Sequence, residues 1–346
     1  MKFDLFYQLP AAATQDPAER YRELMAEAIE ADRLGFDTLW LAEIHFSPRF
    51  CTLPVPTLQL AAIAERTTRL RLGIAVHLLP LHHPVRLAEE IATLDVLSGG
   101  RVEFGAGRGA FPNNYHGFGV DMGTSRERFE EMLALVRSAW SDERLTFHGR
   151  FYELDDIEVF PKPAQRPSPP IRLAANSPDT FRFAGANGYP IFAGGPVNPI
   201  NVLPERLAIY HRALAEARLS LPSDWLAALF LTFVGQSREA VRATIEQSLI
   251  NYFRTVSEMI RPESIAVPED YERVVERTRS MRYETVESLM AVFGEPERCV
   301  HRIAALREQF GFTRMVCWFE TGGLSGHRNV IEAMRLFAEH VMPHFK

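Results

Sequence analysis

The sequence alternates short runs of β-branched and aromatic residues with amphipathic helical stretches along most of its length. Such alternation is typical of parallel strands joined by crossover helices. We count eight strand-and-helix units, and eight parallel strands suffice to close a (β/α)8 TIM barrel. An open, doubly wound sheet shares the pattern, so the alternation favours the barrel without excluding the open sheet. The expected strands lie at residues 3–8, 37–42, 71–76, 101–107, 171–175, 190–194, 226–234 and 313–319.

Two stretches interrupt this alternation. Residues 146–170 read as a hairpin followed by a proline-rich passage that cannot be helical. Residues 251–285 form a charged segment with weak periodicity. Insertions of this length are usually lids, partner-binding elements or mobile loops. We therefore expect a single barrel domain over residues 1–346 with two insertions.

Composition excludes several classes of partner. The formal net charge is −6 and the sequence pI is about 6.0, so no basic stripe suits nucleic acid. The three cysteines lie far apart and indicate neither a disulfide framework nor a zinc knuckle. The start of the chain lacks a secretory signal, and the longest apolar run, 225–234, is about half a membrane span. A soluble protein of the reducing cytoplasm, without membrane or nucleic-acid partners, is expected.

Catalytic residues of such barrels lie at the carboxyl ends of the strands. Glu43 and His45 follow the second expected strand, close enough in sequence to reach the same mouth of the barrel. A carboxylate beside a histidine is suited to general acid–base work. The alternative is a surface acid beside a packing histidine, and this pair alone does not decide between them.

The loop after the fourth strand, residues 105–110, is rich in glycine. Its glycines let the backbone approach a ligand, and Arg108 supplies a forked cation for phosphate. The loop superficially satisfies the G-x-G-x-x-G/A dinucleotide pattern. That motif must open a helix at once, whereas from Pro112 the chain is expected to continue as loop until a helix near Ser125. A turn without any ligand is the other alternative.

The sequence NSPDT follows the fifth strand and indicates a helix N-terminus. Asn176 or Ser177 can cap the helix, and Pro178 suits its first turn. The exposed N–H groups and the Thr180 hydroxyl could bind an anion, although an ordinary cap has the same sequence. Together, the Arg108 loop and this helix N-terminus on adjacent units suggest one phosphate held between them.

Three histidines lie close together in LGIAVHLLPLHHPVR. His77 ends the third strand and is a candidate for facing the substrate pocket. His82 and His83 precede Pro84, where packing of the turn accounts for them. No nearby carboxylate or cysteine completes a set of metal ligands, so no metal is predicted.

At this point the sequence resembles the bacterial-luciferase-like family of flavin-dependent monooxygenases over nearly its whole length. The order of the matching segments carries the resemblance. These segments are FDTLWLAEIHF, HPVR with LDVLSGGRVEFGAGRG, FGVDMGTSRERFEEML, NSPDT, GEPERC and MVCWFETGG.

The resemblance implies a luciferase-like barrel that binds FMN, with the phosphate near the Arg108 loop and the NSPDT helix. The isoalloxazine ring would lie across the third strand, where the family often has a non-proline cis peptide that corresponds to Ala75–Val76. The implied cofactor-binding residues are Ala75, Val76, Gly107, Arg108, Asn176, Ser177 and Thr180.

Two positions depart from the light-emitting members of the family. Those members carry paired histidines after the glutamate, and the first of these is Ile44 here. They also carry a cysteine beside the flavin, where this chain has Gly107. The missing histidine is the base in light emission, so its absence argues against aldehyde bioluminescence. Neither change affects the expected flavin scaffold.

The resemblance further implies that reduced FMN and O2 oxygenate a small organic substrate through a flavin hydroperoxide. His45 is then the expected proton donor or hydrogen-bond partner, with Glu43 orienting it, and the 251–285 insertion could cover the mouth. No NAD(P)H motif is visible, so we expect diffusible reduced FMN from a separate flavin reductase, and a homodimer. The alternatives are an F420-dependent hydride-transfer enzyme of the same fold and a non-catalytic flavin-binding subunit.

Overall fold

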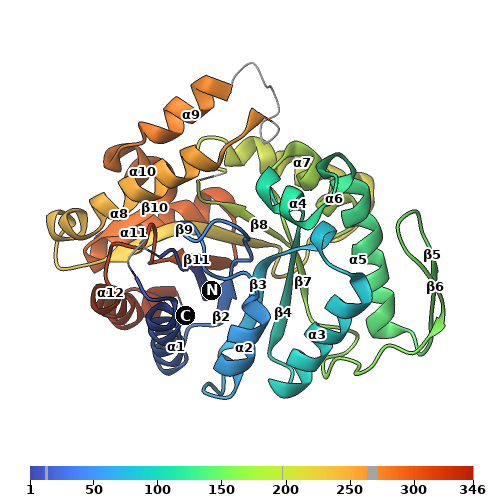
Figure 1. Ribbon diagram of the computed structural model, residues 1–346. Helices are drawn as coiled ribbons and strands as arrows, with labels where there is room; N and C mark the ends of the chain where they lie inside the picture. Colours follow the sequence, from blue (N-terminus) through green and yellow to red (C-terminus); the bar gives the residue numbers. More distant parts are fainter. Residues whose placement is uncertain (12–14, 197, 263–270, 346) are drawn as a thin grey trace.

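The computed structural model describes residues 1–11, 15–196, 198–262 and 271–345. Eight parallel strands close a barrel, because β9 pairs with both β8 and β11, and helices surround it (Figure 1). The predicted (β/α)8 barrel is confirmed, and the open sheet is excluded. Its strands are β1 (Lys2–Tyr7), β2 (Thr38–Leu41), β3 (Arg71–Leu78), β4 (Val102–Gly107), β7 (Ile171–Ala174), β8 (Ile191–Gly194), β9 (Leu226–Val234) and β11 (Arg314–Trp318).

The helices of the outer layer begin and end at residues suited to those positions. At α1, the Asp16 side chain accepts a hydrogen bond from the Ala18 N–H, and Gly35 ends the helix with a left-handed φ of 83°. Several other helices have proline in the first turn, where a missing N–H costs no bond. The helices are α1 (Pro17–Leu34), α2 (Pro56–Ala64), α3 (Pro84–Leu97), α4 (Pro112–Phe118), α5 (Ser125–Ser141), α6 (Pro178–Ala186), α7 (Leu203–Glu216), α8 (Arg238–Met259), α9 (Tyr271–Arg279), α10 (Tyr283–Met290), α11 (Pro296–Phe310) and α12 (His327–His340).

The first insertion contains the expected hairpin, and the described part of the second is largely helical. β5 (Leu145–His148) and β6 (Glu153–Ile157) form an antiparallel hairpin. Residues 251–259 continue α8, and α9 and α10 follow the undescribed residues 263–270. The weak periodicity hid this helix because its buried positions include Ser248, Thr255 and Ser257 as well as aromatic residues.

A ninth strand, β10 (Ala291–Gly294), lies outside the predicted set of eight. It pairs with Leu231–Val234 of β9, whereas β11 pairs with Ala227–Leu231. On this edge, the first part of β9 therefore pairs with β11 and its last part pairs with β10. A four-residue strand between two helices shows too little alternation to be recognised from sequence.

The amino ends of the barrel strands enclose a network of buried charges. The Arg314 guanidinium is 2.8 Å from Asp4 Oδ2, 3.2 Å from Glu103 Oε1 and 3.0 Å from Asp224 Oδ2. Arg172 is 3.2 Å from Asp224. Burial works against the charged form of each acid, but the positive charges of Arg314 and Arg172 hold the pKa of Glu103 low and that of Asp224 at about 2. These residues close the floor of the barrel.

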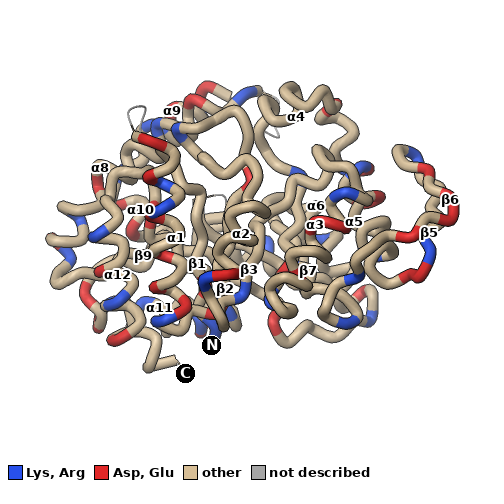
Figure 2. The backbone as a smooth tube through the Cα atoms, turned by 60° about the horizontal axis from the view of Figure 1, so that its bottom comes forward, with Lys and Arg blue, Asp and Glu red and all other residues tan. Residues whose placement is uncertain are grey.

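The surface carries charges of both signs. In Figure 2, the positions of basic and acidic residues are interspersed along the backbone. The three cysteines are free and buried. Within the described ranges, no helix combines the length and apolar character that crossing a membrane requires.

Candidate active site

A buried glutamate at the carboxyl end of β2 is surrounded by histidines. Glu43 is 3% exposed, and its Oε1 lies 2.7 Å from His82 Nε2 and 3.2 Å from His45 Nε2. Its Oε2 lies 3.5 Å from His77 Nδ1. The predicted neighbours Glu43 and His45 are thus in contact, and two further histidines share the same carboxylate.

The charge states in this cluster follow from burial and proximity. Burial alone would raise the pKa of Glu43, but the charge of His82 and hydrogen bonds from His45, His77 and His82 hold it well below the usual range. Burial lowers the pKa of His77. Burial also opposes a charge on His82, yet the Glu43 carboxylate raises the pKa of this histidine. These directions favour an ion pair between Glu43 and His82 and the neutral form of His77.

Two interpretations of the histidines need correction. A carboxylate does join His77 and His82, because adjacent strands β2 and β3 bring Glu43 beside residues far along the chain. His82 is therefore more than a packing residue of its turn. The 2.7 Å contact of Glu43 with His82 is a hydrogen-bond distance, shorter than the separation of about 3.3 Å between two ligands of one tetrahedral zinc ion.

The other two histidines differ in their surroundings. His83 is exposed and packs against Tyr152, with ring centroids 5.9 Å apart, as expected for a turn residue. His77 is 1% exposed and stacks on Phe104 at 4.8 Å. It is not among the side chains that line the cavity described below. The structure therefore places His77 behind the pocket, as a partner of Glu43.

Aromatic rings cover His45. Phe118 meets the imidazole edge to face with centroids 4.7 Å apart, and Phe46 lies at 5.8 Å. The His45 side chain is 11% exposed as a result. Gly117 permits this packing, because a Cβ there would come within 2.1 Å of the Phe46 ring. The cover limits the access of water to His45.

A cavity of about 200 Å³ opens at the carboxyl ends of the strands. Ala75 and Val76 of β3 line it, and the peptide bond between them is cis, as predicted. Asn176, also predicted as a cofactor-binding residue, lies on the same wall. Since His77 follows Val76 directly, one strand separates this cavity from the Glu43 cluster.

A second cavity of about 140 Å³ combines the glycine loop with the N-terminus of α6. Gly107, Arg108 and Thr180 line it, and Ala174 lines both this cavity and the larger one. Ser177 caps α6, with its hydroxyl 3.0 Å from that of Thr180. The two loops that were predicted to share a phosphate therefore face a single space.

Arg108 is the free cation of this second cavity. Arg126, which also lines it, lies 3.1 Å from Glu130 and 3.7 Å from Asp179. Within the described part of the chain, the Arg108 guanidinium has no hydrogen bond or ion pair. A free guanidinium beside exposed N–H groups of a helix is suited to a phosphate group. The residues present therefore fit a nucleotide cofactor that extends from one cavity into the other.

The loop that was expected to continue from Pro112 is in fact a helix. A short helix, α4, begins at Pro112, directly after the glycine loop, and not near Ser125. Asn114 and Tyr115 are buried in this turn, and the Tyr115 hydroxyl donates to the Arg108 carbonyl. The dinucleotide fold is excluded by the closed barrel, in which β4 is one of eight strands.

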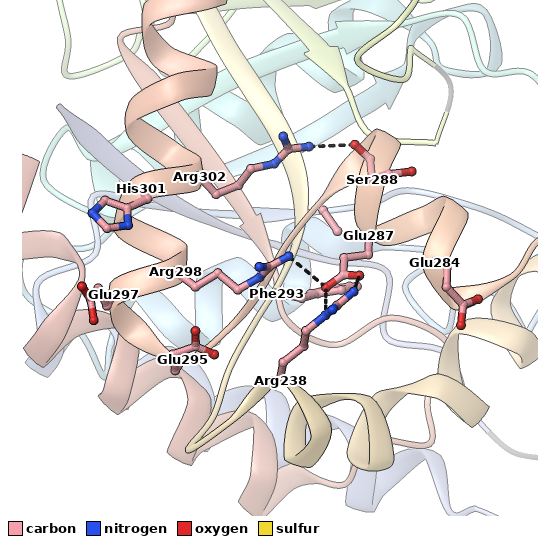
Figure 3. A pocket seen from close by; sticks show the side chains of 11 residues that line it. Arg238, Glu284, Glu287, Ser288, Phe293, Glu295, Glu297, Arg298, His301 and Arg302 are labelled. Atoms are coloured by element: carbon pink, nitrogen blue, oxygen red, sulfur yellow. Dashed lines mark hydrogen bonds and ion pairs between the residues drawn. The ribbon is translucent and has the colours of Figure 1, made fainter.

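A third cavity, of about 810 Å³, lies elsewhere, between α10, α11 and the start of α8 (Figure 3). Its side chains are mostly charged and pair with one another. Glu287 binds Arg238 at 2.5 Å and Arg298 at 3.4 Å, and Arg302 donates to the Ser288 carbonyl. Because its arginines already contact Glu287 or the Ser288 carbonyl, we place no chemistry there.

Sequence reasoning missed two residues of the candidate site. His82 was assigned to the turn, because nothing in the local sequence distinguishes it from His83. Tyr252 of α8 lines the cavity, and it lies within the insertion expected to cover the mouth. Nothing in the local sequence distinguishes this tyrosine from a packing residue.

Comparisons with known proteins agree with the fold. The luciferase-like monooxygenase family model matches residues 1–314, and the chain belongs to this family. The uncharacterized protein y4wF of Sinorhizobium fredii is 31% identical over 93% of this chain and 91% of its own. The oxygenase component of the flavin-dependent trigonelline monooxygenase of Acinetobacter baylyi is 27% identical over 100% and 96%.

Two solved structures show the same architecture. The monooxygenase RslO1 from Streptomyces bottropensis superimposes with a TM-score of 0.85 at 27% identity, over 100% of both chains. The oxygenating constituent of 3,6-diketocamphane monooxygenase from Pseudomonas putida, solved with FMN, gives 0.80 at 21%, over 99% and 98%. From family and fold together, the chain is a flavin-dependent monooxygenase.

Proposed function

We propose that this chain is the oxygenase half of a two-component system, which receives reduced FMN from a separate flavin reductase and oxygenates a small organic substrate with O2. One observation supports a phosphate-bearing flavin such as FMN: the Arg108 guanidinium and the N-terminus of α6 line one cavity, which adjoins the mouth of the barrel. The names of two relatives, an oxygenase component and an oxygenating constituent, support the division of labour.

In this proposal, Arg108, Ser177 and Thr180 hold the phosphate, and Gly107 allows its close approach. The ring lies against Ala75 and Val76, with Asn176 beside it. Gly107 cannot be replaced without movement, because a Cβ there would be 2.3 Å from Val76 Cγ2. Bound reduced FMN supplies the electrons with which O2 is activated.

His45 holds the proton that the activated oxygen needs, at a position from which Phe46 and Phe118 exclude water. Glu43 orients the imidazole through the 3.2 Å contact. His82 is a positioning residue in this scheme, since its charge keeps Glu43 ionised. Loss of His45 or of its cover by Phe46 and Phe118 would release hydrogen peroxide without product.

The chain is also proposed to form a homodimer through α2 and α3. Leu58 is 69% exposed and Leu97 57% exposed, and both line an apolar groove of about 280 Å³ between these helices. Contiguous exposed apolar surface of this kind marks association sites. Sedimentation equilibrium at micromolar concentration should give twice the mass of the chain. A monomer would contradict this part of the proposal.

The oxygenase proposal is tested by supplying reduced FMN from an independent flavin reductase under ¹⁸O2, with a panel of organic substrates. One labelled oxygen atom should enter the product, and the other should appear in water. Reduced F420 in place of FMN should support no turnover. Turnover with F420 without oxygen consumption would establish hydride transfer instead.

The phosphate assignment has its own test. Arg108→Ala should weaken FMN binding about ten- to hundredfold and riboflavin binding little, because only FMN carries the phosphate, and a charge-assisted hydrogen bond is worth about 1.5–3 kcal/mol. Arg126→Ala is the matched control, since Arg126 already has acidic partners. Equal loss of both ligands in Arg108→Ala would refute the assignment.

A further inference from the structure

The short helix α4 contacts both halves of the candidate site. It begins directly after the loop that carries Arg108, and its last residue, Phe118, packs on His45 with ring centroids 4.7 Å apart. At the start of the helix, Phe111 meets Phe50 edge to face at 5.5 Å. One helix of seven residues therefore lies between the cavity proposed for the phosphate and the cover of the proposed proton donor.

Tyr115 attaches this helix to the Arg108 loop. It is 1% exposed, and its hydroxyl donates a hydrogen bond to the Arg108 carbonyl. Burial raises the pKa of Tyr115 to about 12, so the hydroxyl keeps its proton and remains a donor at neutral pH. The backbone of Arg108 is thus bound to α4, whereas its side chain lines the cavity. A movement of Arg108 toward a phosphate would act on α4 through this bond.

Glycines at both ends of α4 suit the helix to move as a unit. Gly109 before it and Gly119 after it have left-handed φ values of 79° and 66°. Glycine adopts and leaves this conformation at little steric cost. Hinges are a few residues at the ends of an element that absorb such changes. The helix can therefore shift while the strands on either side keep their positions.

A buried amide shows that the observed position of α4 leaves polar groups unsatisfied. Asn114 is 1% exposed, and among the described residues neither the oxygen nor the nitrogen of its side chain has a hydrogen-bond partner. Buried polar groups normally have partners, and a group without one costs stability. The present position of α4 is therefore less favourable than its burial suggests. A ligand that favours a second position has less to overcome.

The far end of the helix controls access to His45. Phe118 is 45% exposed and Phe46 is 59% exposed, with their ring centroids 5.6 Å apart. Phe46 has a φ of 57°, which is unusual for a bulky residue and is retained where the surrounding structure holds it. Helix α4 supplies both Phe118 and the close approach of Gly117 to Phe46. A shift of α4 therefore tightens or loosens the cover.

We propose that Tyr115 is a positioning residue that couples occupation of the phosphate cavity to closure of the aromatic cover over His45. When Arg108 pairs with a phosphate, its loop holds α4 through the Tyr115 hydroxyl. Helix α4 in turn holds Phe118 against the imidazole. The cover is then tightest while a cofactor with its phosphate is bound. This inference rests on the proposed phosphate assignment and goes beyond it, because it links the two ends of the site.

The reactivity of His45 measures the cover without turnover. Diethyl pyrocarbonate acylates accessible imidazoles, and mass spectrometry of the peptide that contains His45 gives the rate. FMN and riboflavin carry the same ring, so a difference between them isolates the phosphate. With saturating FMN, His45 should react about two- to tenfold more slowly than with saturating riboflavin, because the coupling cannot exceed the free energy of one neutral hydrogen bond. Exposed His83 should react equally with both. Equal rates at His45 would overturn the proposal.

The variant Tyr115→Phe removes the hydroxyl and keeps the ring. It should abolish the difference between FMN and riboflavin in His45 reactivity. Tyr210→Phe is the matched control, because buried Tyr210 also donates to a backbone carbonyl, that of Tyr189 at 3.1 Å, next to the amino end of β8. This control should keep the full difference. If Tyr115→Phe keeps the difference, or Tyr210→Phe loses it as well, Tyr115 does not couple the two ends of the site.

Binding constants measured on the same samples distinguish this proposal from the phosphate assignment. If Arg108→Ala removes a preference for FMN over riboflavin, but His45 in the parent enzyme reacts equally with both, the coupling alone is wrong. If the parent enzyme shows no preference for FMN, the phosphate assignment is wrong and the coupling fails with it. Both measurements are made without substrate, so neither depends on the oxygenation reaction.

Discussion

Both ends of the barrel bury charged residues, but the two sets differ in chemistry. At the floor, Arg314 contacts three acids and is 1% exposed, and no cavity adjoins it among those described. At the mouth, Glu43 is shared by three histidines, one strand away from an apolar cavity. Burial disfavours the charged carboxylates at both ends. Guanidinium groups offset this cost at the floor, and imidazole groups offset it at the mouth.

The choice of cation indicates what each end does. Arginine stays charged at every pH that a cell meets, so the floor keeps its positive charges and serves the stability of the barrel. Histidine changes its charge near neutrality, so the cluster around Glu43 can hold and release protons. This comparison predicts that substitutions at the floor affect folding, whereas substitutions at the mouth affect chemistry.

The largest effect is expected at the floor. Arg314→Leu removes the positive charge that Asp4 and Glu103 share, and leaves two buried carboxylates without it. Loss of one partner of a buried ion pair costs about 3–5 kcal/mol in free energy of unfolding. Urea denaturation at pH 7 measures this loss.

A surface pair provides the control for the floor. Arg335 contacts Glu30 at 2.6 Å, but its side chain is 52% exposed, so Arg335→Leu should cost less than about 1 kcal/mol. If Arg314→Leu has the same free energy of unfolding as Arg335→Leu, the floor does not serve the stability of the barrel. If Arg314→Leu instead folds normally and forms less product per O2 consumed, the floor takes part in the chemistry.

At the mouth, His45→Ala should change the products and leave the fold intact. FMN affinity should stay within a few-fold, because His45 is not on the wall of either cofactor cavity. Hydrogen peroxide release should rise, and product per O2 consumed should fall roughly tenfold or more, as expected when a general acid is lost. Parallel assays of peroxide and product measure the ratio. Full coupling in this variant would make His45 a packing residue.

The floor and the mouth also differ in how far the sequence predicted them. All eight barrel strands were predicted within about two residues of their bounds, because buried parallel strands read as continuous apolar runs. The acids and arginines of the floor come from β1, β4, β7, β11 and the approach to β9, and no local pattern links them. Only closure of the barrel brings them together.

The residues of the mouth were predicted only where they are neighbours in sequence or follow adjacent strands. Glu43 and His45 are neighbours in sequence, and the Arg108 loop and the NSPDT helix follow adjacent strands. His82 could not be assigned, because its contact with Glu43 depends on the path of the turn after β3. Tyr252 could not be assigned either, since α8 extends beyond the expected helix and returns over the cavity.

The smallest effect is expected for His82→Gln, and it should depend on pH. The pKa of His82 is raised, so the ion pair is complete below the ordinary histidine pKa of about 6.5 and is lost as the pH rises through the raised value. The pKa of Glu43 is lowered, so the carboxylate persists at acid pH. Without the charge of His82, which is the largest of the lowering effects, burial should raise the pKa of Glu43.

A nearby positive charge lowers a carboxyl pKa, so loss of the His82 charge moves protonation of Glu43 toward neutral pH. Protonated Glu43 no longer orients His45 as an acceptor, so the ratio of product to peroxide in His82→Gln should fall about threefold between pH 8 and pH 6. The parent enzyme should hold its ratio over the same acid range. His83→Gln is the matched control, because His83 packs against Tyr152 next door in sequence without joining Glu43. Parallel pH profiles for all three proteins would show that His82 only fills its turn, and the mouth would then lose the proton chemistry that separates it from the floor.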